Sequence, residues 1–126
     1  IAAANAVLPA ADARWSFEGD ARDSVGPHHG ELFSGAVIRN GRLILDGVSA
    51  NMRTVALERD IHEKTFEVWV ALANLQQQGG GVLGIDTPVG RFFDSIVFGE
   101  LQPKRWMAGS DFFNRSEKMK RQHPEN

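Results

Sequence analysis

The sequence predicts an all-β fold built from short antiparallel strands. About seven short stretches combine apolar and β-branched residues, turn signals separate these stretches, and no stretch shows a strong helical period. Such a pattern is typical of a sandwich or barrel of antiparallel sheets. The 126 residues suffice for one domain with a core of its own.

The first strand is expected near the start of the chain. Ala13, Trp15 and Phe17 alternate with polar and charged residues, and this period of two indicates a half-buried strand. Residues 19–30 follow as a loop, because they are rich in Gly, Asp, Pro and Ser.

The clearest local signal is a hairpin. Asn40 and Gly41 separate the apolar stretches 36–39 and 42–45, and both residues tolerate the positive φ angles of a type I′ turn, whose twist matches that of the strands. A two-residue turn sets a register that pairs Ile38 with Leu43, Val37 with Ile44, and Arg39 with Arg42.

The next two segments receive different predictions. Leu57 and Ile61 lie four residues apart, which predicts one or two helical turns over residues 57–64. Residues 65–72 alternate as a strand. The expected apolar face of that strand consists of Phe66, Val68, Val70 and Leu72, and the opposite face of Thr65, Glu67, Trp69 and Ala71.

The last third of the chain continues the pattern of short strands. Residues 79–81 are three glycines and predict a flexible break between strands. Strands are expected over 82–85, 92–98 and 105–108. Residues 112–122 show a weaker pattern, which leaves a frayed helix and a disordered tail as alternatives.

Composition excludes several classes of function. The chain contains no cysteine, so disulfides, thiolate metal sites, cysteine nucleophiles and covalent haem attachment by CxxCH are ruled out. The formal net charge of -2 gives no electrostatic reason to expect a nucleic-acid partner. No apolar run approaches the ~20 residues that span a bilayer, so we expect no membrane span.

Three regions are expected along the chain. Residues 1–12 are small and apolar, contain Pro9 and suit a linker or a processed N-terminal segment. Residues 13–115 form the sandwich, or the N-terminal part of one. Residues 116–126 form a polar tail.

The sequence predicts no catalytic site. It lacks the GxSxG, HExxH and GxxxxGK[ST] motifs. Glycosidases need two carboxylates within ~10 Å of each other. Asp94 and Glu100 are the nearest acidic pair on one expected strand, but six strand residues span ~20 Å, which is too far.

Two aspartates are candidates for a metal site. Asp20 and Asp23 lie in the glycine-flanked loop, and calcium favours clustered carboxylate oxygens in such loops. The alternative is that these carboxylates cap the loop through hydrogen bonds to its backbone. His28 and His29 lie in the same loop, but neighbours in sequence point apart on a strand, which disfavours a shared metal.

The tryptophans are candidates for ligand contact, because aromatic faces bind sugars by stacking and also fill cores. Trp15 lies on the apolar face of its strand and suits a core position. Trp69 shares its face with polar residues, and Trp106 follows basic residues. The candidate ligand-binding residues are therefore Trp69, Arg105, Trp106 and Asp111.

Several motifs carry a resemblance to a known family. The chain resembles the laminin-G-like, concanavalin-A-like jelly-roll domains of the lectin and glucanase type. The generic part of the resemblance lies in residues 15–18, 23–26, 29–30, 40–47 and 64–70. The more specific part lies in residues 78–82, 93–100 and 105–112. These three motifs resemble a subgroup found in large planctomycete-type exported proteins that also carry cytochrome-c-like domains.

The resemblance implies a two-sheet antiparallel jelly-roll sandwich, an extracytoplasmic location in the periplasm or on the cell surface, and a binding or structural role. It transfers no functional residues, and the E-x-D-x-x-E motif of the related glucanases is absent. Three functions follow in order of preference: a lectin-like module for polysaccharide, a structural or protein-interaction domain, and a glycosidase.

Domains of this family continue beyond the region that matches here. The sandwich is therefore expected to be either shortened or incomplete at its C-terminus. An incomplete sandwich would leave an unpaired sheet edge, which invites association with a second copy or with the missing C-terminal half.

Overall fold

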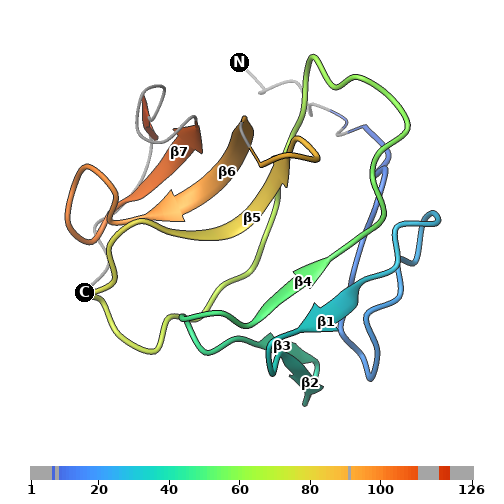
Figure 1. The fold of residues 1–126 in the computed structure, drawn as a ribbon, viewed down its shortest axis with the longest axis horizontal. Helices are drawn as coiled ribbons and strands as arrows, with labels where there is room; N and C mark the ends of the chain where they lie inside the picture. The colour runs from blue at the N-terminus through green and yellow to red at the C-terminus, as the bar shows by residue number, and fades with distance from the viewer. Residues whose placement is uncertain (1–6, 8, 91, 111–116, 120–126) are drawn as a thin grey trace, which may run out of the picture. The chain divides into compact units, whose positions relative to one another are not determined.

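The fold is all-β (Figure 1). The computed structural model describes residues 7, 9–90, 92–110 and 117–119. These residues contain eight strands and no helix, and every strand pair is antiparallel. No helix in these ranges is long and apolar enough to cross a membrane. The all-β prediction is confirmed, while the finer two-sheet jelly roll stays a prediction.

The chain divides into two compact units, residues 1–59 and 60–126. Unit 1 holds two small sheets, each of two strands. One sheet pairs β1 (Glu31–Phe33) with β4 (Asn51–Arg53), and the other pairs β2 (Val37–Arg39) with β3 (Arg42–Ile44).

The predicted hairpin is confirmed down to its register. β2 and β3 pair Val37 with Ile44, Ile38 with Leu43, and Arg39 with Arg42. Asn40 and Gly41 have φ angles of 52° and 68°, the positive values that a type I′ turn requires at both central positions. This element needs only local chemistry, because both strands and the turn lie within eight consecutive residues.

The strand predicted over residues 13–17 is wrong as a regular element. Its only strand-like pairing is an isolated bridge between Trp15 and Asp23. Phe17 has a φ angle of 59°, which takes the chain out of the extended conformation. The predicted alternation in burial is nevertheless present, since Ala13, Trp15 and Phe17 are each half-buried between exposed neighbours.

Unit 2 is organised around one four-stranded sheet. Its order is β5 (Gly80–Asp86), β6 (Phe93–Phe98), β7 (Trp106–Ser110) and β8 (Glu117–Lys118). Figure 1 shows β5, β6 and β7 side by side, as their pairing requires. The strands predicted near 82–85, 92–98 and 105–108 are confirmed, with shifted ends.

Two expectations at the ends of this sheet are corrected. Gly80 and Gly81 belong to β5 and pair with Phe98 and Val97, so they are strand residues rather than a flexible break. Within residues 112–122, the described Glu117 and Lys118 form β8 instead of a helix, because they complete a ladder with β7. Residues 112–116 and 120–122 of that expectation lie outside the described residues.

The core of unit 2 lies on the two central strands. Val97, Phe98 and Met107 are buried, and the Phe98 ring meets Trp106 edge-on with centroids 4.8 Å apart at 60°. This is a favourable aromatic geometry. The backbone N–H of Leu101 approaches the Met107 sulfur at 3.3 Å, so the turn after β6 closes over Met107.

The helical turns predicted over residues 57–64 and the strand predicted over 65–72 are both wrong. Residues 57–64 contain bends at 58–59 and 62–63 and no helical turn, because one or two isolated turns do not repay the cost of helix nucleation. Residues 65–72 have no strand assignment, because a strand exists only through hydrogen bonds to a neighbour and no described strand pairs with them.

Candidate functional site

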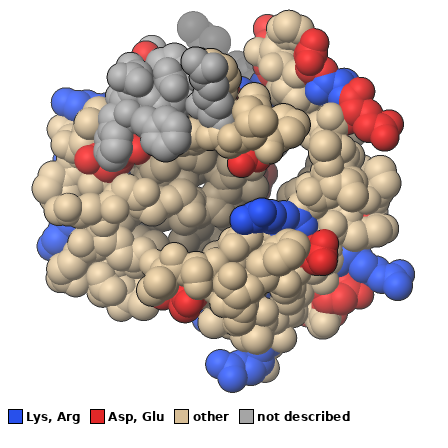
Figure 2. All heavy atoms as spheres, viewed as in Figure 1, with Lys and Arg blue, Asp and Glu red and all other residues tan. Residues whose placement is uncertain are grey.

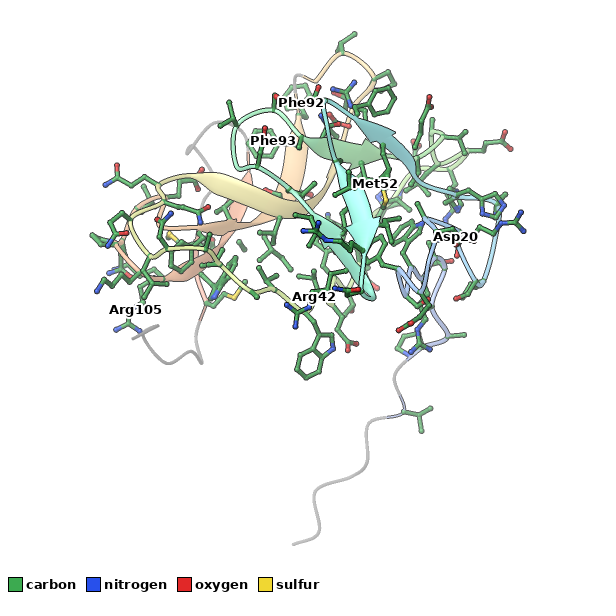
Figure 3. All side chains as sticks on the ribbon, turned by 90° about the horizontal axis from the view of Figure 1, so that it is seen from below. Asp20, Arg42, Met52, Phe92, Phe93 and Arg105 are labelled. Carbon is green, nitrogen blue, oxygen red and sulfur yellow. The ribbon has the colours of Figure 1, made fainter. Side chains whose placement is uncertain are left out.

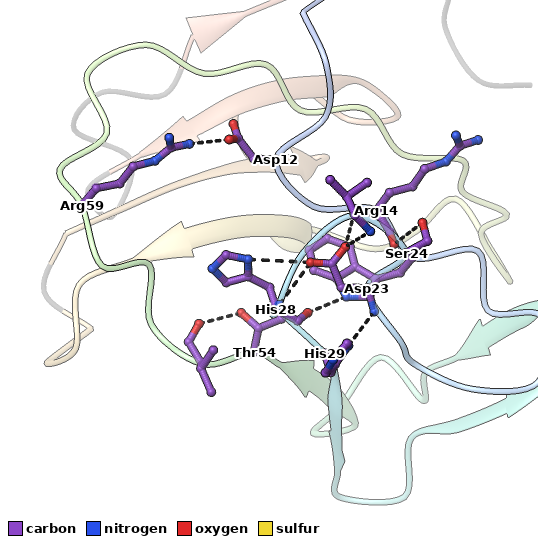
Figure 4. Close-up of polar contacts among 11 residues, drawn as sticks. Asp12, Arg14, Asp23, Ser24, His28, His29, Thr54 and Arg59 are labelled. Carbon is purple, nitrogen blue, oxygen red and sulfur yellow. Dashed lines mark hydrogen bonds and ion pairs between the residues drawn. The ribbon is translucent and has the colours of Figure 1, made fainter.

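Polar side chains gather at two places, one in each unit. The first is the loop around Asp23 in unit 1 (Figure 4). The Asp23 carboxylate is buried and accepts backbone N–H donors from both sides of the loop. Arg14 and Val25 donate to Oδ1 at 2.9 Å each, and His28 donates to Oδ2 at 3.1 Å. One side chain therefore ties residue 14 to the turn at residues 25–28.

These donors determine the charge state of Asp23. Burial raises the pKa of Asp23, but the backbone N–H groups of Arg14, Val25, Gly26 and His28 stabilise the ionised form more strongly and lower it from 3.8 to about 2. The carboxylate therefore stays charged at neutral pH, and several backbone N–H donors stabilise its negative charge.

The neighbouring rings brace the same loop. The Trp15 indole Nε1 donates to the backbone carbonyl of His28 at 2.8 Å, and the Asp23 backbone N–H donates to His29 Nδ1 at 3.1 Å. The Nδ1 atom of His28 lies 3.7 Å from Asp23 Oδ2 and is buried. The His28 Nδ1 atom has no hydrogen-bond partner among the described residues, but the other polar contacts of the cluster are made to protein groups, which fits a structural latch.

The two aspartates predicted to bind calcium have different surroundings. Asp20 is exposed, and its Oδ1 accepts the backbone N–H of Arg22 at 2.9 Å. Asp23 directs both oxygens at backbone donors. Within the described ranges, no group of three His, Asp or Glu side chains is arranged to hold a metal ion. The contacts of both residues fit the loop-capping alternative, and calcium binding stays a prediction.

The second place is a groove of about 560 Å³ in unit 2, which we call the β6–β8 groove. Residues directly opposite each other on antiparallel strands point to the same face. Ile96 is paired with Ala108, and Ala108 with Glu117, so these three share a face with Asp94. The lining consists of His62, Lys64, Phe66, Asp94, Ser95, Ile96, Ala108, Gly109, Glu117 and Met119.

An ion pair lies in the groove. Lys64 Nζ pairs with Asp94 Oδ2, and both side chains are partly exposed. The pair joins Lys64 to the second residue of β6 across thirty residues of chain. It presents an ammonium and a carboxylate side by side, with the Phe66 ring on the same lining.

On the face drawn in Figure 2, Lys and Arg side chains are interspersed with Asp and Glu rather than gathered into a patch of one sign. This distribution matches the balanced composition of 14 basic and 16 acidic residues.

The four predicted ligand-binding residues are not brought together. Trp69 is 95% exposed. Trp106 lines a second hollow of about 390 Å³ with residues 70–75 and contacts Phe98. Arg105 is half-buried, and Figure 3 shows it at the outer edge of its unit. Asp111 lies outside the described residues.

The groove contains residues that sequence reasoning did not select. His62, Lys64 and Glu117 belong to no motif, and the sequence singles out Asp94 only as the acidic neighbour of Glu100 on one strand. Asp94 lines the groove, and Glu100 is not among the lining residues. The Oε2 atom of Glu100 lies 3.2 Å from the position that a Cβ on Gly109 would occupy. No local signal links Lys64 to Asp94, because the two residues lie thirty positions apart and only tertiary folding brings them together.

Comparison with known proteins adds no relative. No protein-family model matches this chain, and no curated protein or solved structure matches it significantly. The resemblance to laminin-G-like jelly rolls therefore stays a prediction from the sequence motifs.

Proposed function

We propose that this chain is a non-catalytic, lectin-like module that binds polysaccharide as part of a larger extracytoplasmic protein, and that the β6–β8 groove holds the saccharide. The observation that carries this proposal is the Lys64–Asp94 pair beside Phe66 in the groove. The groove volume lies in the ~300–1,000 Å³ range of small-molecule sites.

The chemistry of the lining suits a hydroxyl-rich ligand. Sugar hydroxyls both donate and accept hydrogen bonds, so an adjacent ammonium and carboxylate can engage neighbouring hydroxyls at once. The Phe66 ring offers an apolar surface for the C–H face of a sugar ring. Ala108 carries only a methyl group and Gly109 no side chain, which leaves room above β7.

Binding is tested by calorimetric titration of neutral and acidic oligosaccharides, preceded by thermal melts with each sugar. A ligand at about one hundred times its Kd raises the free energy of unfolding by about 2.7 kcal/mol. We expect Lys64→Met and Asp94→Asn each to weaken binding about tenfold or more. Repeating the titration with calcium and with EDTA tests the calcium prediction.

The matched control breaks a different ion pair. Arg59 Nη2 lies 2.7 Å from Asp12 Oδ1 in unit 1, and both side chains are well exposed. Arg59→Met should leave saccharide affinity unchanged. Equal affinity in the Lys64→Met variant and the wild type would reject the groove as the site, and no binding across the panel would reject the lectin-like function.

The alternative function is a structural or protein-interaction domain. A specific observation favours it too, namely the exposed segment 65–72, which lacks a strand partner among the described residues. A chain that binds protein and ignores every sugar in the panel would fit this alternative.

A further inference from the structure

Residues 65–72 of unit 2 have unused capacity for strand pairing. No backbone hydrogen bond joins them to any other described residue. Backbone N–H and C=O groups are obligatory hydrogen-bonding groups, and an open row of them is a template for another strand. The segment is therefore competent to extend a sheet.

The side chains of this segment are unusually open for their type. Trp69 is 95% exposed, and Val68 and Val70 are 40% and 41% exposed. The segment reads Thr-Phe-Glu-Val-Trp-Val-Ala-Leu, with strong strand formers, no Pro, no Gly and the single charge of Glu67. Such composition in an exposed segment is characteristic of a strand that pairs between chains.

We propose that residues 65–72 form a dimerisation strand, which pairs antiparallel with the same residues of a second copy about a two-fold axis at Trp69. The partner follows from the self-complementarity of the segment. An isologous interface places one patch against itself, so each pairing must be favourable in both directions.

The register centred on Trp69 meets this condition. It places Trp69 against Trp69, Val68 against Val70, and Phe66 against Leu72. These are aromatic and β-branched cross-strand pairs, which stabilise antiparallel ladders. Glu67 falls opposite Ala71, so no like charges meet.

Other registers are less favourable. Centring the axis on Glu67 would place two carboxylates directly opposite each other, which is destabilising. Centring it between Val68 and Trp69 would put Val68 opposite Trp69 and send the two apolar faces to opposite sides of the ribbon. The Trp69 register pairs every position from Phe66 to Leu72.

This proposal gives Trp69 a different role from the ligand contact expected from the sequence, although Phe66 belongs both to the groove lining and to the proposed strand. Trp69 is absent from the described lining of the β6–β8 groove. Loss of dimerisation and loss of sugar binding are therefore separable by mutation.

The first test uses the absence of cysteine in the chain. A single Trp69→Cys substitution creates the only thiol of each copy. Because residues directly opposite in an antiparallel pair have Cβ atoms ~4.5–5.5 Å apart, mild oxidation should form an intermolecular disulfide. Val89→Cys is the control, since Val89 is 84% exposed in the turn between β5 and β6. Equal crosslinking in the two variants would overturn the proposal.

The second test uses charge and needs no crosslink. Sedimentation equilibrium should show a reversible monomer–dimer equilibrium for the wild type. Trp69→Lys and Trp69→Glu should each be monomeric, because each places like charges across the axis, and an equimolar mixture should dimerise again. Val89→Lys should dimerise as the wild type does. A monomeric wild type at high concentration, or a mixture that stays monomeric, would overturn the proposal.

Discussion

The Oδ1 atom of Asp23 accepts a hydrogen bond from the backbone nitrogen of Arg14 at 2.9 Å, across nine residues of chain. The same oxygen accepts the backbone N–H of Val25, also at 2.9 Å. Residues 13–17 form no regular strand ladder. Hydrogen bonds to the Asp23 carboxylate hold the Trp15 segment against the loop that follows instead.

Replacing this carboxylate should destabilise unit 1. Asp23→Asn keeps the shape but turns an amide donor toward backbone N–H groups, which leaves buried donors unsatisfied. We expect a loss of about 1–3 kcal/mol in the free energy of unfolding, measured by urea denaturation. Asp20→Asn is the control, because Asp20 is exposed, and it should stay within about 0.5 kcal/mol of the wild type.

Acid should remove the same stabilisation. The pKa of Asp23 is lowered from 3.8 to about 2 in the folded protein, so its contribution is fully present above pH 4 and is lost as the pH falls toward 2. Its size is on the order of 2 kcal/mol. The pKa of Asp46 is also lowered, by the N–H groups of Val48, Ala50 and Ser49. The free energy of unfolding of Asp23→Asn should therefore still fall with decreasing pH, but less steeply than that of the wild type. An identical acid profile for Asp23→Asn and the wild type would contradict this role.

The buried methionine of unit 2 should carry a large share of its stability. Met107 is fully buried on β7, and Met107→Ala should cost about 2–5 kcal/mol, since truncation leaves a cavity in the core. Val89→Ala removes a side chain that is already solvent-exposed and should cost less than about 0.5 kcal/mol. Thermal melts of the two variants check the difference. Similar melting temperatures would contradict the role of Met107 in the core.

Two glycines with nearly equal φ angles separate backbone strain from crowding. Gly90 and Gly99 have φ angles of 65° and 69°. A Cβ on Gly90 would meet open space, whereas one on Gly99 would clash with the backbone carbonyl oxygen of Gln77. Gly90→Ala should cost about 1 kcal/mol from strain alone, and Gly99→Ala about 1–3 kcal/mol more. Urea denaturation of both variants gives the comparison, and equal costs would show that the chain at Gln77 yields freely.

The sequence by itself determined the elements whose interactions are local. The Asn40–Gly41 hairpin was predicted with its register, because turn geometry alone sets the pairing of the flanking strands. The strands β5, β6 and β7 were located near their observed positions, because apolar and β-branched residues between turn signals favour a pleated sheet.

Only the tertiary structure decided the features that need distant partners. Residues 65–72 carry a strand pattern as clear as that of β6, yet no described strand pairs with them. Lys64 meets Asp94 across thirty residues, and Glu117 reaches the same groove through the pairing of β8 with β7. Sequence patterns report which conformation a segment prefers and which face it buries. They do not report which neighbour supplies its hydrogen bonds and charges, because that depends on contacts made when the whole sheet assembles.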